Sequence, residues 1–258
     1  MYLLNKNNNA FIERPIYLKL FNNHTNDIDI FNKLIRNEKN ELKKKSMIHD
    51  LNMLKLGVLG EKKIDYELSN SRIPMLILHD LKLTYNNYKS QIDFVIILNN
   101  YLLVIESKYL NGDLEITKNG DFIRYIRNEK GFIYKKECIY NPITQNLRHI
   151  DIIKDILETE LSLFNIDKYL KPVIVLTNHK SIINDKYNYC LNNDIIRCDK
   201  LVPYIINLSS NNILYDDNFL YEISDTLLKF NENSDFSYKQ KYIAEFNNYK
   251  KEPFAYLH

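Results

Sequence analysis

The stretch QIDFVIILNNYLLVIESKY, residues 91–109, predicts two apolar β-strands joined at Asn99 and Asn100. Asparagine tolerates the positive φ that a two-residue hairpin turn requires. In an antiparallel pair with this turn, the numbers of opposed residues sum to a constant, so Asp93 faces Glu106. A four-residue loop keeps the same register, whereas a three-residue loop would change it. The pattern therefore predicts two carboxylates directly opposite each other within apolar strands.

The charged residues of this hairpin favour a metal site. Opposed residues have Cβ atoms about 5 Å apart, and like charges so placed destabilise a sheet. A divalent cation between Asp93 and Glu106 would remove the repulsion. Lys108 lies on the same face as Glu106, where it can hold a water molecule or stabilise an anionic transition state. Two acids, a cation and a lysine suit phosphodiester hydrolysis. The alternative is that the hairpin opens into solvent and its acids are simply hydrated.

A third acid is predicted to approach the hairpin from the preceding helix. Residues 51–69 carry an apolar stripe at helical spacing, and Glu61 lies on this stripe rather than on the polar face. A carboxylate there needs a partner or a metal. Gly57 and Gly60 lie one turn apart, which lets the helix approach another element closely. The alternative is that Glu61 lies at the edge of the stripe and extends into water.

The other segments predict a mixed α/β fold with a largely antiparallel start. A helix is expected over 26–50, before the helix at 51–69. The later elements are strands at 75–83, 92–98 and 101–108, short antiparallel strands at DLEIT (113–117), FIRYIR (122–127) and FIYKK (132–136), a helix at 141–161, and buried strands at 171–178 and 195–198. The last forty residues predict two amphipathic helices, with the apolar residues Phe219, Leu227, Leu228, Tyr242 and Phe246.

Composition and charge exclude several classes of protein. The net charge of +2 gives no global basic field, so a nucleic-acid site has to be local. The three cysteines form no CxxC pair, which argues against a zinc knuckle or a disulfide framework and favours the cytoplasm. We expect no signal peptide, because residues 1–15 lack a long apolar region. We expect no membrane contact, because no apolar run approaches the roughly 20 residues of a spanning helix.

These segments resemble the nuclease-related domain (NERD) family of the PD-(D/E)xK nuclease superfamily. Asp93 followed by Glu-x-Lys at 106–108 is similar to the superfamily motif, and GVLGEKKIDYEL (57–68) is similar to the GxxGE helix of the family. Further matching segments are HDLKL (79–83), QIDFVII (91–97), LLVIESKYLNGDLEI (102–116), NPITQNLRH (141–149) and, more loosely, IIRCDKLVP (195–203). The resemblance covers roughly residues 50–180.

The resemblance implies a fold and a division of the chain. The fold is α/β, with a restriction-endonuclease-like mixed sheet that starts as an antiparallel meander, continues as αβ units and is flanked by helices. We expect an N-terminal helical extension at 1–50, a nuclease-like core at 51–207 and C-terminal helices packed on the core at 208–258.

The resemblance also implies roles for individual residues. Glu61, Asp93 and Glu106 match metal-binding acids, and Lys108 matches the lysine that positions or activates water. Gln145 matches a glutamine that lies near the site in related nucleases, so it joins the four as a candidate catalytic residue. Hydrogen bonding at the helix N-terminus is an equal alternative for Gln145.

Three neighbours of Gln145 are interpreted differently. For Asn141 and Pro142 we favour the role of ending the loop and opening the helix. A lone histidine is more often structural than catalytic, and His149 is interpreted in this way.

The expected function is a nuclease that uses Mg²⁺ or Mn²⁺ to cut DNA, in DNA processing or in defence against foreign DNA. Candidate contacts to the nucleic-acid backbone are Arg148, Lys43, Lys44, Lys45, Arg124 and Arg127. For the lysine run, a solvated helix face is the alternative. The alternatives for the whole chain are a non-catalytic nucleic-acid- or protein-binding module on the same fold, and an RNase. The oligomeric state is left open, a homodimer included.

Overall fold

The structure, a computed structural model, describes three stretches of the chain, which are residues 11–209, 214–232 and 241–242. At its centre lies the predicted hairpin, formed by β3 (Tyr88–Ile97) and β4 (Leu102–Lys108). Val95 faces Val104 in this pair, which confirms the predicted register. The paired parts of both strands are buried on both faces, and this explains why their sequences are continuously apolar.

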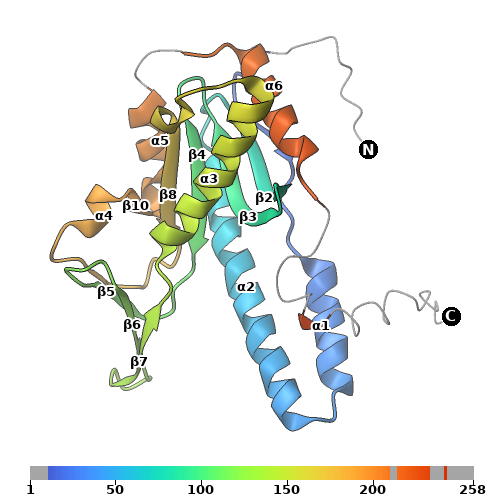
Figure 1. The fold of residues 1–258 in the computed structure, drawn as a ribbon. Helices are drawn as coiled ribbons and strands as arrows, with labels where there is room; N and C mark the ends of the chain where they lie inside the picture. The colour runs from blue at the N-terminus through green and yellow to red at the C-terminus, as the bar shows by residue number, and fades with distance from the viewer. Residues whose placement is uncertain (1–10, 210–213, 233–240, 243–258) are drawn as a thin grey trace.

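Six strands form the central sheet (Figure 1). In order across the sheet they are β1 (Pro15–Lys19), β2 (Met75–Tyr85), β3, β4, β8 (Leu170–Leu176) and β10 (Ile195–Arg197). The strands β2, β3 and β4 are antiparallel, whereas β1 is parallel to β2, β8 to β4 and β10 to β8. The predicted fold class, a mixed sheet that starts antiparallel and is flanked by helices, is confirmed. The strand β1 was not predicted.

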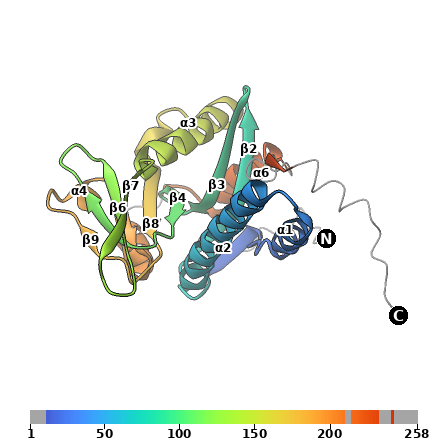
Figure 2. The same ribbon diagram turned by 90° about the horizontal axis from the view of Figure 1, so that it is seen from below.

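Helices cover both faces of this sheet, since its strands carry apolar residues on both sides. One face packs against α3 (Pro142–Leu161) and α6 (Asp217–Lys229), and Val104 of β4 lies in this layer. The opposite face packs against the second half of α2 (Glu41–Ser69) and against α5 (Leu201–Ser209). Figure 2 shows α3 and α2 on opposite sides of β4 and β8.

The three short strands predicted after the hairpin form a second sheet instead of extending the first. Its strands, in order, are β7 (Ile133–Ile139), β6 (Phe122–Arg127), β5 (Asp113–Ile116) and β9 (Ile183–Asn184). Gly112, with a φ of +99°, makes the turn that leads from β4 into this sheet. Leu114 and Phe122 pack against Leu176 of β8, so the second sheet lies at one edge of the first (Figure 1).

The helices before the hairpin differ from the prediction. α1 (Thr25–Asn37) ends before Asn40, and α2 continues without a break across residue 50. The side chain of Asn40 caps α2 by accepting hydrogen bonds from the backbone N–H groups of Leu42 and Lys43. The expected helix boundary at residue 50 is therefore wrong, because the cap lies ten residues earlier. The division of the chain into three parts stays a prediction.

The remaining elements are short helical turns and part of the C-terminal region, of which the structure describes residues 214–232 and 241–242. Short helical turns are η1 (Ile166–Lys168), α4 (Tyr189–Asn192) and η2 (Cys198–Lys200). The first predicted C-terminal helix is α6, in which Leu227 is buried. Tyr242 packs against α1 and α2, and Phe246 lies outside the described residues. In the part of the chain that the structure describes, no helix is both long and apolar enough to cross a membrane.

Candidate functional site

β3 and β4 separate at the two acids of the hairpin. Their pairing ends with Phe94 opposite Ile105, so Asp93 and Glu106 are the first residues beyond the paired region. From there β3 continues beside β2, whereas β4 continues beside β8. The sheet therefore forks at this point. Asp93 lies in the fork, where its carboxylate accepts a hydrogen bond of 2.7 Å from the backbone N–H of Ser107.

Glu61 reaches the fork from α2. Its side chain is only 16% exposed, and Oε2 lies 2.8 Å from Nε2 of His79 on β2. This excludes the alternative in which Glu61 extends into water. Burial raises the pKa of Asp93 well above its usual range, and the charges of Glu106 and Glu61 raise it further. The three acids predicted as a set are therefore close enough to interact.

The close approach of α2 depends on Gly60. A Cβ atom at this position would lie 2.7 Å from Oγ1 of Thr177 and 3.0 Å from Oγ of Ser107. Gly57, one turn earlier, is different, since a Cβ atom there would meet nothing closer than 3.8 Å. The predicted approach is confirmed for Gly60, whose backbone touches the ends of β4 and β8 beside the fork.

We expect Gly60→Ala to lower the free energy of unfolding by about 1–3 kcal/mol, because the added methyl group overpacks this contact. Glu61 follows directly in the helix, so a displacement of α2 also moves an acid of the site. Gly57→Ala is the matched control and should raise the free energy of unfolding by about 0.5–1 kcal/mol, because alanine favours a helix. Urea unfolding of both variants measures the difference. Equal effects at the two positions would contradict the close approach.

Lys108 lies between Glu106 and α3. Its Nζ donates hydrogen bonds to Oε1 of Glu106 at 2.6 Å and to Oε1 of Gln145 at 2.9 Å. Of the two interpretations of Gln145, contact with the site is therefore the one observed. The N-terminus of α3 is capped instead by Asn141, whose side chain accepts two backbone N–H bonds, and Pro142 is the first residue of the helix.

His149 on α3 holds Glu106 from the other side. Its Nε2 lies 3.3 Å from Oε2 of Glu106, and its Nδ1 is hydrogen-bonded to the hydroxyl of Ser90. Burial opposes ionisation of Glu106, but the hydrogen bond with His149 and the charge and hydrogen bond of Lys108 outweigh it and lower the pKa of Glu106. The two hairpin acids therefore differ. The surroundings of Glu106 favour its ionised form, whereas the surroundings of Asp93 disfavour its ionised form.

Neither histidine of the site was predicted. His79 is not among the predicted site residues, and His149, for which a structural role is expected, contacts an acid of the site. A signal was present for His79, because it lies within an otherwise apolar strand sequence, MLILHDLKL at 75–83. A polar group in such a strand is buried and must find a hydrogen-bond partner.

The three acids fit a hard divalent cation by their chemistry. Carboxylate oxygens are the ligands that Mg²⁺ and Mn²⁺ prefer, and a cation would relieve the repulsion felt by Asp93. In the described residues each acid also has a protein partner: Ser107 for Asp93, His79 for Glu61, and Lys108 with His149 for Glu106. Within 11–209, 214–232 and 241–242, no group of three or more His, Cys, Asp or Glu is arranged around a single metal position.

The sequence around this fork matches a known family. Residues 56–177 match the profile of the family described as nuclease-related domain. This part of the chain is a nuclease-related domain. The family belongs to the PD-(D/E)xK-like nuclease superfamily, so the resemblance recognised in the sequence is confirmed. Glu61, Asp93, Glu106, Lys108 and Gln145 all lie within the matched residues.

One solved structure is similar to this chain over most of its length. It is Can2 from Sulfobacillus thermosulfidooxidans in complex with cyclic tetra-adenylate, with 15% sequence identity and a TM-score of 0.32. The similarity covers 73% of this chain and 53% of the Can2 chain. This chain therefore spans about half the length of Can2. No curated protein matches the chain.

Of the residues predicted to contact nucleic acid, Arg148 lies beside Gln145 and His149, which are the partners of Lys108 and Glu106. It is on α3, one turn after Gln145, and its guanidinium lies over the ring of Tyr140, 5.8 Å from the centroid. A groove of about 930 Å³ runs along this part of α3. Its lining includes Lys89, Ser90, Gln91, Gln145, Arg148 and His149, together with the acids Asp151 and Asp155. The groove therefore leads from Arg148 to the partners of Lys108 and Glu106.

The other predicted contacts lie away from the fork. Arg124 and Arg127 are in β6 of the second sheet, where both pair with acids of neighbouring strands. Residues 43–45 are in the first turns of α2, about 24–27 Å from Glu61 along the helix axis. Their contact with nucleic acid stays a prediction.

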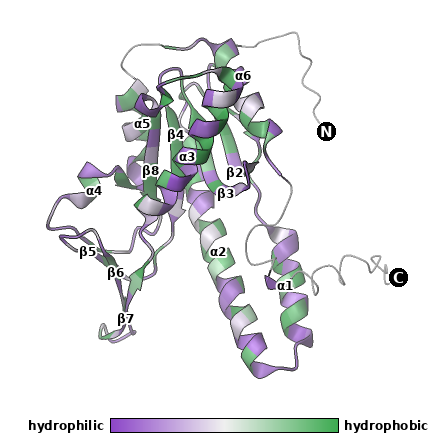
Figure 3. Cartoon of the chain, viewed as in Figure 1, coloured by the Kyte–Doolittle hydropathy of each residue, from purple (hydrophilic) through white to green (hydrophobic). Residues whose placement is uncertain are grey.

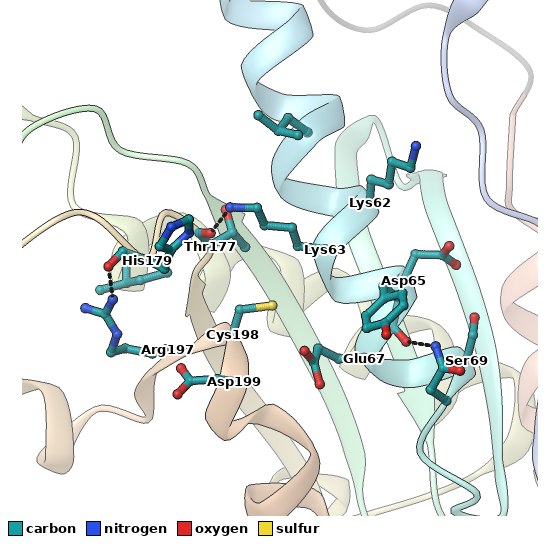
Figure 4. Close-up of a pocket in the computed structure, with 14 residues that line it drawn as sticks. Lys62, Lys63, Asp65, Glu67, Ser69, Thr177, His179, Arg197, Cys198 and Asp199 are labelled. Atoms are coloured by element: carbon teal, nitrogen blue, oxygen red, sulfur yellow. Dashed lines mark hydrogen bonds between the residues drawn. The ribbon is translucent and has the colours of Figure 1, made fainter.

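A second cleft, of about 740 Å³, lies between the second half of α2, the end of β8 and residues 197–199 (Figure 4). Lys63 points across it and donates a hydrogen bond of 2.8 Å to the backbone oxygen of Thr177. The charges that line the cleft balance, since Lys62, Lys63 and Arg197 are matched by Asp65, Glu67 and Asp199. None of the five predicted catalytic residues lines this cleft, whereas Gln145 lines the groove along α3.

Proposed function

We propose that this chain is a metal-dependent nuclease that hydrolyses phosphodiester bonds of DNA, in DNA processing or in defence against foreign DNA. The observation that carries the proposal is the convergence of Glu61, Asp93, Glu106 and Lys108 at the fork of the central sheet. All four lie in the nuclease-related domain. A module that only binds nucleic acid has no need of three interacting acids and a lysine at one place.

Glu61, Asp93 and Glu106 would hold the divalent cation, for which we propose Mg²⁺ or Mn²⁺. When bound, such a cation lowers the pKa of water and shields the charge of the phosphoryl group. The protein prepares the site electrostatically. Glu106 is kept ionised by His149 and Lys108, whereas burial and the other two acids disfavour a second negative charge on Asp93. Positive charge at the fork is therefore stabilised.

Lys108 would stabilise the negative charge that develops on the phosphoryl oxygens and would orient the attacking water. An ammonium group has three N–H donors. Two of these are used in the contacts with Glu106 and Gln145, which leaves one for water or for a phosphate oxygen. The side chain of Lys108 is 23% exposed, so a substrate can reach it. The two contacts restrict its motion, and pre-organised charge of this kind is what accelerates a reaction.

The substrate strand would lie in the groove along α3. Arg148 would contact a phosphate there, and such contacts position the strand without reading its sequence. Because Gln145 and His149 lie in the same groove, a phosphate held by Arg148 would be next to the residues that hold Lys108 and Glu106.

A cleavage assay tests the proposed function. Purified protein is incubated with plasmid DNA, linear DNA and RNA of matched length, in Mg²⁺, in Mn²⁺ or in excess EDTA. We expect cleavage of DNA with either metal and none in EDTA, since the acids need a cation to act on an anionic substrate. Cleavage that persists in EDTA or in Glu106→Gln would contradict the mechanism. Preferred cutting of RNA would favour the RNase alternative, and binding without cleavage the binding module.

A further inference from the structure

His79 connects the N-terminal segment of the chain with the site. Its imidazole is fully buried and lies between the rings of Phe21 and Phe94, with 4.6 Å between centroids on each side. Its Nε2 lies 2.8 Å from Oε2 of Glu61. Because the ring has no contact with solvent, its hydrogen bonds have to be satisfied by the protein.

The tautomer of His79 follows from its second contact. The backbone N–H of Asn22 points to Nδ1 over 3.1 Å, and an amide N–H can only donate. Nδ1 is therefore an acceptor without a proton, which places the ring proton on Nε2. His79 is thus a neutral imidazole that donates Nε2–H to the carboxylate of Glu61.

Other residues of the same segment hold the backbone of β2 in place. Nζ of Lys19 donates a hydrogen bond of 2.9 Å to the backbone oxygen of His79 and a second one to that of Asp80. Asp80 has a left-handed backbone with a φ of +49°, so these bonds support an irregular point of the strand. Lys19, Phe21 and Asn22 all precede residues 56–177, which match the family.

We propose that His79 is a positioning residue for Glu61, and that the segment 15–22 belongs to the nuclease site because it selects the tautomer of His79. The proposal rests on the proposed function, in which Glu61 is a metal ligand. The donated hydrogen bond holds one oxygen of Glu61 and leaves the other oxygen available to the fork. With the opposite tautomer, a lone pair of Nε2 would face the carboxylate and repel it.

The second histidine of the site provides a contrast. His149 has its Nε2 beside Glu106, but its Nδ1 faces the hydroxyl of Ser90. A hydroxyl donates or accepts, so this contact does not select a tautomer. Of these two histidines, His79 is the one whose tautomer is selected by the backbone of another segment.

Two substitutions separate positioning from packing. His79→Gln keeps an N–H donor near the place of Nε2, whereas His79→Asn keeps a polar group near Nδ1 and loses the donor to Glu61. We expect Mn²⁺ affinity within about 3-fold of wild type for His79→Gln, and about 10–100-fold weaker for His79→Asn. Cleavage should follow the same order through kcat, with little change in the KM for DNA, because the buried ring cannot touch substrate. Equal losses in both variants would overturn the proposal.

A further measurement requires neither metal nor cleavage. In ¹⁵N NMR of the metal-free wild-type protein, we expect the His79 signals of a protonated Nε2 and an unprotonated Nδ1. The ¹³C signal of the Glu61 carboxyl group should move in His79→Asn and stay in His79→Gln. A protonated Nδ1 would overturn the proposal. If the wild-type protein neither binds Mn²⁺ nor cuts DNA, the proposed function fails, while these two NMR signals still decide whether His79 positions Glu61.

Discussion

Asp93→Asn is expected to lower DNA cleavage by at least about 10³-fold and, at the same time, to raise the thermal stability of the protein. Cleavage falls because asparagine cannot supply the negative charge that holds a cation, and such a contribution is several kcal/mol. Stability rises because the carboxylate of Asp93 is buried beside Glu106 and Glu61. The oxygen of asparagine can still accept the hydrogen bond from Ser107, so the fork keeps its shape.

Calorimetry and kinetics measure the two halves of this prediction. A gain of about 1 kcal/mol would raise Tm by about 2–4 °C, recorded by differential scanning calorimetry in EDTA. Asp225→Asn is the matched control, because Asp225 is an exposed acid on α6. It should change stability by less than about 0.5 kcal/mol and leave cleavage unaltered. A lower Tm for Asp93→Asn, with the control unchanged, would contradict the electrostatic account of Asp93.

Lys108→Met is expected to slow the chemical step by about 10²–10³-fold while DNA binding stays close to that of wild type. Methionine keeps the length of the stem but removes the charge that would face the phosphoryl oxygens. It also removes one of the two groups that lower the pKa of Glu106, so this acid becomes harder to ionise. The loss therefore acts on the reaction more than on the affinity for the substrate.

Single-turnover cleavage and fluorescence anisotropy separate these effects. Gln145→Leu should give an intermediate loss, because it removes one of the two contacts of Nζ and leaves the charge of Lys108 in place. Lys168→Met is the control, since Lys168 is exposed in η1. If Lys108→Met weakened binding and cleavage in parallel, Lys108 would be a binding residue without a role in the chemical step.

The centre of the fold could be predicted because its pairing is local. Only Asn99 and Asn100 separate the two strands, so the pairing of Val95 with Val104 follows from counting along the chain. The position of Glu61 on the inner side of α2 also follows from local information, because the helical period determines which residues share a face. The same holds for Asn141, whose type and place before a proline indicate a helix start.

Two features of the fold could not be predicted in this way. The apolar pattern continues through residue 50, and the cap at Asn40 decides where α2 begins. The short strands after the hairpin have the pattern of any antiparallel meander. They form a separate sheet because Leu114 and Phe122 pack against Leu176, a residue that lies far along the chain. A strand pattern specifies which residues pair and point inward, but not which sheet the strand joins.

The sequence by itself therefore determined which charged residues of the hairpin lie together, and the tertiary structure decided how they are held. Asp93, Glu106 and Lys108 could be located because a hairpin and an alternating face are local. The fork, and the contact of His79 with Asn22, 57 residues away, required the folded chain. An apolar face produces a periodic pattern that can be recognised in the sequence. A hydrogen bond depends only on the positions of its two atoms and produces no such pattern. Only the tertiary structure brings the N–H of Asn22 to Nδ1 of His79, the contact from which we infer the tautomer.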